Sequence, residues 1–89
     1  MVELIWDDPF IKNVRKWLKK HPEMKIRFEE RIRLFAQEPF HPSLKTHNLS
    51  GKLNNYWAFS ITHDYRLVFK FLSSKKVLLI DIGSHKEVY

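Results

Sequence analysis

The chain has 89 residues, of which 44% are hydrophobic and 15% aromatic, with no cysteine and a formal net charge of +6. This composition supports one folded domain over residues 1–89, excludes a disulfide framework or a thiolate metal site, and favours polyanionic partners. No stretch approaches the roughly 20 apolar residues of a membrane span, and no signal peptide is visible, so we expect a cytoplasmic protein without a membrane partner.

The first part of the chain is predicted to form a strand and a helical hairpin. Apolar residues alternate from Val2 to Trp6, which indicates a strand. Asp8 and Pro9 are typical of a helix start, because aspartate caps free amides and proline fits the first helical position. This helix ends at "KKHPE", and a second helix follows over residues 23–37. The predicted inward-facing residues are Phe10, Ile11, Val14, Trp17 and Leu18 in the first helix, and Met24, Phe28, Ile32 and Phe35 in the second.

The second part of the chain is predicted to be a loop followed by strands. "EPFHPSLKTHNLSGK" contains two prolines and shows no sustained period, so we expect a loop of a length that is often functional. Strand patterns cover residues 55–61, 65–72 and 77–83, and their short connections predict an antiparallel meander. The expected fold is therefore α+β, with the N-terminal strand and helical hairpin packed on an antiparallel sheet of about four strands.

Arg66 is the first candidate for a functional role. It lies in an aromatic strand on the face opposite Leu67 and Phe69, so its guanidinium is predicted to point away from the main core. There it can clamp a phosphate and stabilise developing charge. The alternative is a surface arginine paired with Asp64 or Asp81. No Gly-rich phosphate loop or spaced set of metal ligands is present, so we predict neither a metal nor a cofactor.

Several histidines and a tyrosine suit proton transfer or base stacking. His85 and Tyr89 follow the last strand, where an imidazole can exchange a proton near neutral pH and a tyrosine can stack on a base. By spacing alone, the pattern favours a contact at the edge of the sheet over a functional site. His47 in the loop is also ambiguous, and His63 and Asp64 are typical of a turn that needs only its local hydrogen bonds.

Cations gather in the second half of the chain beside aromatic residues. Most lysines are simply solvated, but a one-sided cluster with aromatic neighbours is typical of a nucleic-acid groove. The lysines are Lys45, Lys52, Lys70, Lys75, Lys76 and Lys86, and the aromatic residues are Tyr56, Trp57 and Tyr65.

Two stretches carry a family resemblance. "LSGKLNNYWAFSITHDYRLVFKF" followed by "LLIDIGSHKEVY" resembles the RelE/ParE superfamily of bacterial toxins from toxin–antitoxin pairs, particularly its RelE, YoeB and YafQ-like mRNA interferases. The resemblance covers essentially the whole chain. It implies cleavage of messenger RNA, usually in the ribosomal decoding site, by attack of the 2′-hydroxyl on the adjacent phosphate without a metal. It also implies a small antitoxin partner that covers the site.

The resemblance also implies roles for single residues. Arg66 matches the strand arginine that contacts the scissile phosphate, and His85 and Tyr89 match the C-terminal histidine and terminal aromatic of YafQ-like members. His47 and Asp64 resemble their loop histidine and turn aspartate. Either His85 or His47 could remove the 2′-proton, leaving Tyr89 or the other histidine to protonate the 5′-oxygen. The predicted RNA-binding residues are Lys45, Lys52, His63, Tyr65, Lys70 and Lys86.

The chain departs from the YafQ-like pattern at two positions. Ser60 stands where these members have a histidine on the first meander strand, with His63 shortly after it, and Asp81 stands where they have an arginine before the final glycine. Two other functions stay open: a ParE-like inhibitor of DNA gyrase, and an inactive homologue that only binds its antitoxin. The predicted arginine, histidine and tyrosine favour the nuclease, because gyrase binding gives no reason for an imidazole beside a phosphate clamp.

Overall fold

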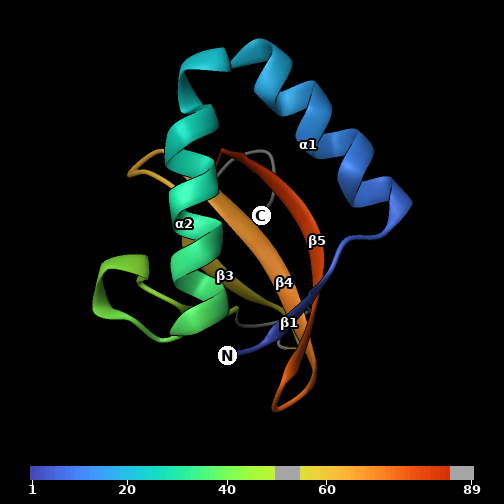
Figure 1. Ribbon diagram of the computed structural model, residues 1–89, viewed down its shortest axis with the longest axis vertical. Helices are drawn as coiled ribbons and strands as arrows, with labels where there is room; N and C mark the ends of the chain where they lie inside the picture. Colours follow the sequence, from blue (N-terminus) through green and yellow to red (C-terminus); the bar gives the residue numbers. More distant parts are fainter. Residues whose placement is uncertain (50–54, 85–89) are drawn as a thin grey trace.

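Two helices lie against one face of a curved sheet, as the computed structural model of residues 1–49 and 55–84 shows (Figure 1). This arrangement confirms the α+β class. Neither described helix is long and apolar enough to cross a membrane. The elements are β1 (Glu3–Ile5), α1 (Asp8–Lys20), α2 (Lys25–Gln37), β2 (His47–Asn48), β3 (Trp57–Ser60), β4 (Tyr65–Ser73) and β5 (Lys76–Ser84), with short 3-10 helices η1 (Pro22–Met24) and η2 (Pro42–Leu44).

The described residues form a sheet of five strands in the order β1-β5-β4-β3-β2. The predicted antiparallel meander of β3, β4 and β5 is confirmed. The sheet differs from the expected one because β1 pairs in parallel with β5, where Leu4 lies beside Val77, and because β2 adds a fifth strand. Parallel neighbours need a long connection, and here the chain from β1 to β5 runs through both helices and through β2, β3 and β4, so short connections gave no hint of this pairing.

The segment expected to be a loop contains two short regular elements among its described residues. Leu44, the last residue of η2, is fully buried, and His47 and Asn48 form β2 against β3. Elements of two or three residues are too short to show a period, so the sequence pattern could not reveal them.

The N-terminus of α1 lies one residue earlier than predicted. The cap is Asp7, whose Oδ1 accepts a hydrogen bond from the backbone N–H of Phe10 at 3.0 Å, while Asp8 is the first helical residue. Pro9 remains within the first turn, where its missing N–H costs nothing. The helix ends at Lys20, directly before His21 and Pro22, as expected.

The main core lies between the helices and the sheet. Phe35 of α2 stacks on Phe59 with ring centroids 4.3 Å apart, and meets Phe69 edge-on at 4.7 Å. Such aromatic pairs add about 0.5–1.5 kcal/mol each beyond the burial of their area. Of the predicted inward-facing set, the buried members are Phe10, Val14, Trp17, Phe28 and Phe35, and the partly buried ones are Ile11, Leu18, Met24 and Ile32.

A bulge in β5 shifts its register against β4. Val68 of β4 lies opposite Asp81, but the next residue, Phe69, lies opposite Leu79, so Ile80 is the extra residue. Ile80 packs on the far face against a small cluster that contains Val68. The carboxylate of Asp81 accepts a hydrogen bond from Asn13 of α1 at 3.2 Å, on the helical side. A bulge re-aims side chains, and here it directs Asp81 toward α1.

Candidate functional site

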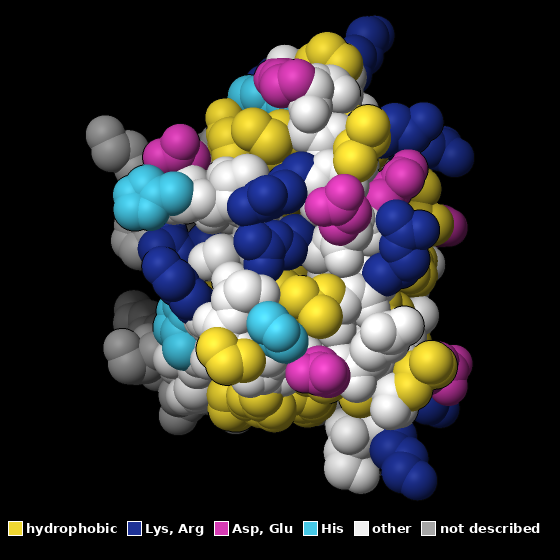
Figure 2. Space-filling model, turned by 60° about the vertical axis from the view of Figure 1, so that its left-hand side comes forward, with side chains coloured by type: hydrophobic (Ala, Val, Ile, Leu, Met, Phe, Trp, Pro, Cys, Tyr) yellow, Lys and Arg dark blue, Asp and Glu magenta, His cyan; other side chains and the backbone are white. Residues whose placement is uncertain are grey.

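A pocket of about 300 Å³ opens at the edge of the sheet where β3 ends, between α2 and the β3–β4 turn. We call it the arginine pocket. Figure 2 shows that Lys and Arg side chains gather on this side of the molecule, with histidines beside them. No acidic residue belongs to the described lining. The lining residues are Arg27, Arg31, Ser43, Lys45, Ser60, Ile61, Thr62, His63 and Arg66.

Arg66 lies on the face of β4 away from the main core. Its neighbour in the sequence, Leu67, is fully buried in that core, whereas Arg66 is half-buried, which agrees with the predicted orientation. Across the strands, Arg66 pairs with Ser60 of β3 and Gly83 of β5. Directly paired residues share a face, so the strand residues beside Arg66 on its face are small. Arg66 is one of the residues that line the arginine pocket.

The alternative ion pairs of Arg66 are not formed with the described acids. The structure of residues 1–49 and 55–84 gives no salt bridge from Arg66 to Asp64 or Asp81. Asp81 is instead bound to Asn13 and, through Oδ1, to the backbone N–H of Ile82 at 2.8 Å. The strand arginine is thus not the partner of either predicted carboxylate.

Two further arginines come from α2. Arg27 donates from Nε to the carbonyl oxygen of Ile61 at 3.3 Å, and Arg31 donates to the carbonyl and hydroxyl oxygens of Ser43 at 3.2 and 3.1 Å. Their spacing of four residues places them on one side of the helix. Because their partners are neutral, the hydrogen bonds hold the side chains without cancelling their charge. The sequence analysis missed both, and their helical spacing was the only signal available.

A chain of hydrogen bonds continues from Arg31 to His41. The backbone N–H of Ser43 lies 3.1 Å from His41 Nδ1, and the Ser43 hydroxyl lies 2.8 Å from the same atom. A backbone N–H can only donate, so Nδ1 accepts, and the hydroxyl donates to it while receiving from Arg31. This chain ties the segment containing η2 to α2 and fixes one wall of the arginine pocket.

Lys45 lines the pocket from a left-handed backbone conformation, with φ 53° and ψ 40°. Among the described residues it is the only non-glycine residue with positive φ. That conformation costs roughly 1–2 kcal/mol for a residue with a Cβ atom. Strain of this kind is concentrated at functional sites.

His47 lies on the same face of the sheet as Arg66, two strands away. It pairs with Ala58, which pairs in turn with Val68. Its Nδ1 atom lies 2.9 Å from the carbonyl oxygen of Lys45. His47 is exposed and is not part of the pocket lining, so the structure places it beside the arginine pocket and not within it.

The other predicted residues are dispersed. His63 lines the pocket, whereas Asp64 is exposed in the turn, with its backbone N–H bound to the Thr62 hydroxyl at 3.2 Å. Lys70 is half-buried further along β4 and is not part of the lining. The remaining predicted site residues lie outside the described part of the chain; they are Lys52, His85, Lys86 and Tyr89.

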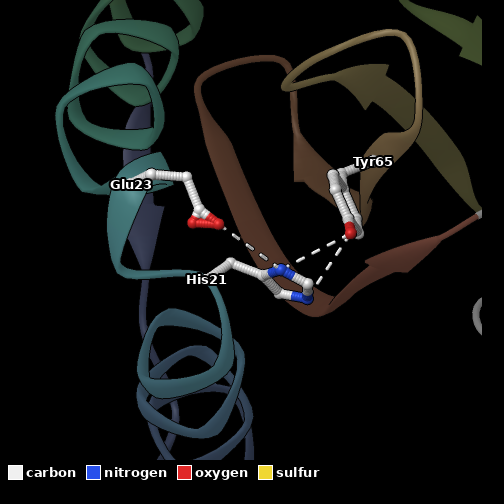
Figure 3. A network of polar contacts seen from close by, with 3 residues as sticks. All are labelled: His21, Glu23 and Tyr65. Atoms are coloured by element: carbon white, nitrogen blue, oxygen red, sulfur yellow. Dashed lines mark hydrogen bonds and ion pairs between the residues drawn. The ribbon is translucent and has the colours of Figure 1, made fainter.

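Tyr65 faces α1, on the opposite side of β4 from Arg66. Its ring centroid lies 5.3 Å from that of Trp17 and 4.9 Å from that of His21. Its hydroxyl lies 3.4 Å from Nε2 of His21, and Glu23 lies 3.9 Å from Nδ1 of the same ring (Figure 3). The structure therefore does not bring Tyr65 to the arginine pocket.

Several solved bacterial toxins share this fold. A solved YafQ from Escherichia coli strain BL21(DE3) has a TM-score of 0.80 at 20% identity, with 100% of this chain and 99% of that chain covered. A copper-bound mutant toxin from Helicobacter pylori has a TM-score of 0.78 at 27% identity, with both chains fully covered. A YoeB/ParE toxin from Agrobacterium tumefaciens has a TM-score of 0.72 at 23% identity, covering 94% of this chain and 99% of that one.

At the level of sequence, no curated protein matches the chain significantly. The profile of the YafQ toxin family, described as bacterial toxins of type II toxin–antitoxin systems, matches residues 2–89. The match spans nearly the whole chain, and the fold agrees with the solved toxins. The chain therefore belongs to the YafQ family of type II toxin–antitoxin toxins.

Proposed function

We propose that this toxin is an endoribonuclease that cleaves messenger RNA, with the scissile phosphate bound in the arginine pocket. The observation that carries the proposal is the convergence of Arg27, Arg31 and Arg66 on one pocket that also contains Lys45. A phosphodiester carries a negative charge that increases as a fifth oxygen bonds to phosphorus. Preorganised guanidinium groups stabilise that increase.

The proposed reaction uses the RNA as its own nucleophile. The 2′-oxygen forms a bond to phosphorus and the bond to the 5′-oxygen breaks, which leaves a 2′,3′-cyclic phosphate and a 5′-hydroxyl. One proton moves from the 2′-hydroxyl to a base, and one moves from an acid to the 5′-oxygen. Arg66, held on a rigid strand, stabilises the phosphoryl oxygens during the exchange.

His47 or His85 is the proposed base, and Tyr89 or the other histidine is the proposed acid. For His47 the structure supports the role, because the Lys45 carbonyl can only accept a hydrogen bond and so the proton resides on Nδ1. In the neutral ring, Nε2 then carries the basic lone pair. Asp64, next to His63 in the turn, is proposed to orient the RNA in the site.

The proposed partners are a cognate antitoxin and the translating ribosome. A DinJ–YafQ toxin–antitoxin complex from E. coli has been solved, with a TM-score of 0.78 to this chain at 20% identity. We infer that an antitoxin of this chain covers the arginine pocket with an acidic segment, because the described lining is cationic. Cleavage in the ribosomal A site agrees with a net charge of +6, which favours binding to RNA.

The test is to induce the toxin in cells and map the 5′ ends of transcripts. New 5′ ends within translated messages are expected, together with their loss in Arg66→Ala. Arg33→Ala is the matched control, because Arg33 is exposed on α2 and does not line the arginine pocket. Intact messages with double-strand DNA breaks would instead identify a gyrase inhibitor. Intact messages and normal growth would identify an inactive homologue.

A further inference from the structure

A second pocket of about 300 Å³ lies between α1 and the bulged part of β5. It shares no lining residue with the arginine pocket. We call it the lysine pocket. Its polar lining comes mainly from α1 and the residue that follows it: Asn13, Lys16, Trp17, Lys20, His21 and Asp81.

We propose that the lysine pocket binds a phosphate group. Lys16 and Lys20 are one helical turn apart, so both ammonium groups lie on the side of α1 that borders the pocket. Trp17 between them is only 6% exposed, and its Nε1 is buried without a hydrogen-bond partner among the described residues. An indole N–H is a donor only. The pocket therefore offers two cations to an acceptor-rich ligand, and the unsatisfied indole donor belongs to a buried residue of its lining.

Asp81 is the group that opposes an anion in this pocket. Its Oδ1 accepts hydrogen bonds from Asn13 and from the backbone N–H of Ile82, which partly offset its charge. The two lysines carry two positive charges against the single negative charge of Asp81, before any contribution from His21. The titratable groups around His21 are Glu23, at 3.9 Å, and the hydroxyl of Tyr65. A phosphate can accept from both ammonium groups at once, since its oxygens are arranged tetrahedrally.

The two pockets flank the same end of the β4–β5 pair. Ile82 also lines the lysine pocket and pairs with Leu67, directly beside the pair formed by Arg66 and Gly83. The bound phosphate can therefore belong to the backbone of a polynucleotide that passes this end of the sheet, or to a free nucleotide. Phosphate binding in this pocket does not depend on the proposed cleavage of RNA.

The experiment follows the indole N–H signal of Trp17 by nuclear magnetic resonance while inorganic phosphate is added to the full chain. A saturable shift of this signal is expected. Lys16→Gln together with Lys20→Gln should weaken the binding at least about tenfold, because two charged donors are removed. The matched control replaces Lys12 and Lys19, which are exposed on α1 outside the pocket and carry the same charge. An unmoved signal, or equal weakening in both double variants, would overturn the proposal.

Two further titrations determine the sign of the preferred charge and the source of the phosphate. Asp81→Asn should tighten phosphate binding, because it removes the opposing charge and keeps the oxygen that accepts from Ile82. Weaker binding in this variant would contradict an anion site.

A short 2′-O-methyl RNA, which cannot be cleaved through its 2′-oxygen, is then compared with a mononucleotide. If the RNA saturates the Trp17 signal at lower concentration, the phosphate belongs to a polynucleotide backbone. If the mononucleotide does so, it belongs to a free nucleotide.

Discussion

His47 Nδ1 and the carbonyl oxygen of Lys45 lie 2.9 Å apart, and this contact determines which nitrogen of the imidazole is basic. The carbonyl can only accept, so the ring donates from Nδ1. The same contact joins a histidine on β2 to a lysine whose backbone is strained. Lys45 also lines the arginine pocket, so the placement of the histidine and the shape of the pocket depend on one short segment.

His47→Gln tests the proposed role of the basic nitrogen. We expect cleavage of a message during translation in vitro to fall by about 10²–10⁴-fold, the usual contribution of a general base. The thermal unfolding midpoint should hardly change, because His47 is exposed. Cleavage at the wild-type rate would assign the base to His85, and His85→Gln should then show the loss instead.

Arg66→Lys tests whether the phosphate clamp needs more than charge. Lysine keeps the positive charge but loses the planar pair of donors, so we expect RNA binding to persist while the cleavage rate falls by about tenfold or more. The two effects are separated by measuring single-turnover cleavage at several concentrations of toxin. If binding and rate fall together, Arg66 serves mainly to hold the RNA.

Ser43→Ala tests the chain of hydrogen bonds from Arg31 to His41. The change removes the hydroxyl that receives from Arg31 at 3.1 Å and lies 2.8 Å from His41. We expect a loss of about 0.5–1.5 kcal/mol in the free energy of unfolding, measured in urea, and weaker RNA binding. Ser74→Ala is the control, because Ser74 lies in the exposed β4–β5 turn. Equal effects in both variants would show that this chain of hydrogen bonds does not support the pocket.

Asp7→Ala and Asp8→Ala distinguish the two candidate caps of α1. Asp7 satisfies the backbone N–H of Phe10, so its loss should lower the free energy of unfolding by about 1 kcal/mol. Asp8 contributes only its charge near the N-terminus, which is worth about 0.3–1 kcal/mol. Denaturant unfolding of both variants at low salt measures the difference. A larger loss of unfolding free energy for Asp8→Ala would identify Asp8 as the N-cap, as expected from the sequence.

Lys45→Gly and Lys45→Ala separate backbone strain from side-chain charge. Both remove the cation from the arginine pocket, so both should weaken RNA binding to a similar extent. Only glycine relieves the left-handed conformation, so Lys45→Gly should be more stable than Lys45→Ala by about 1 kcal/mol. Thermal unfolding of the two variants checks this. Equal stability would show that the segment relaxes when the side chain is shortened.

Local patterns predicted the parts of the fold that depend on neighbouring residues. The alternation around Leu67 and Phe69 placed Arg66 off the main core, and helical spacing selected Phe28 and Phe35 as inward-facing residues. These features follow from the periods of strands and helices, which act over a few residues.

Features that depend on distant residues escaped prediction. Arg27 and Arg31 meet Arg66 only because α2 packs beside the end of β3, and nothing in the helix itself indicates that neighbour. Asp81 turns toward α1 because one extra residue, Ile80, interrupts the register of β5. A bulge has no fixed signature in the sequence, so the direction of the side chains beyond it could not be inferred.

The parallel pairing of Leu4 with Val77 joins β1 to β5. Contacts between residues so far apart in the sequence slow folding, because closing the long loop between them costs entropy before the contacts form. The strand that carries Arg66 also borders β5, so it lacks one neighbour until β5 has been synthesised. On a ribosome the sheet is therefore incomplete until β5 has emerged, and until then β4 has only β3 as its neighbour in the described sheet.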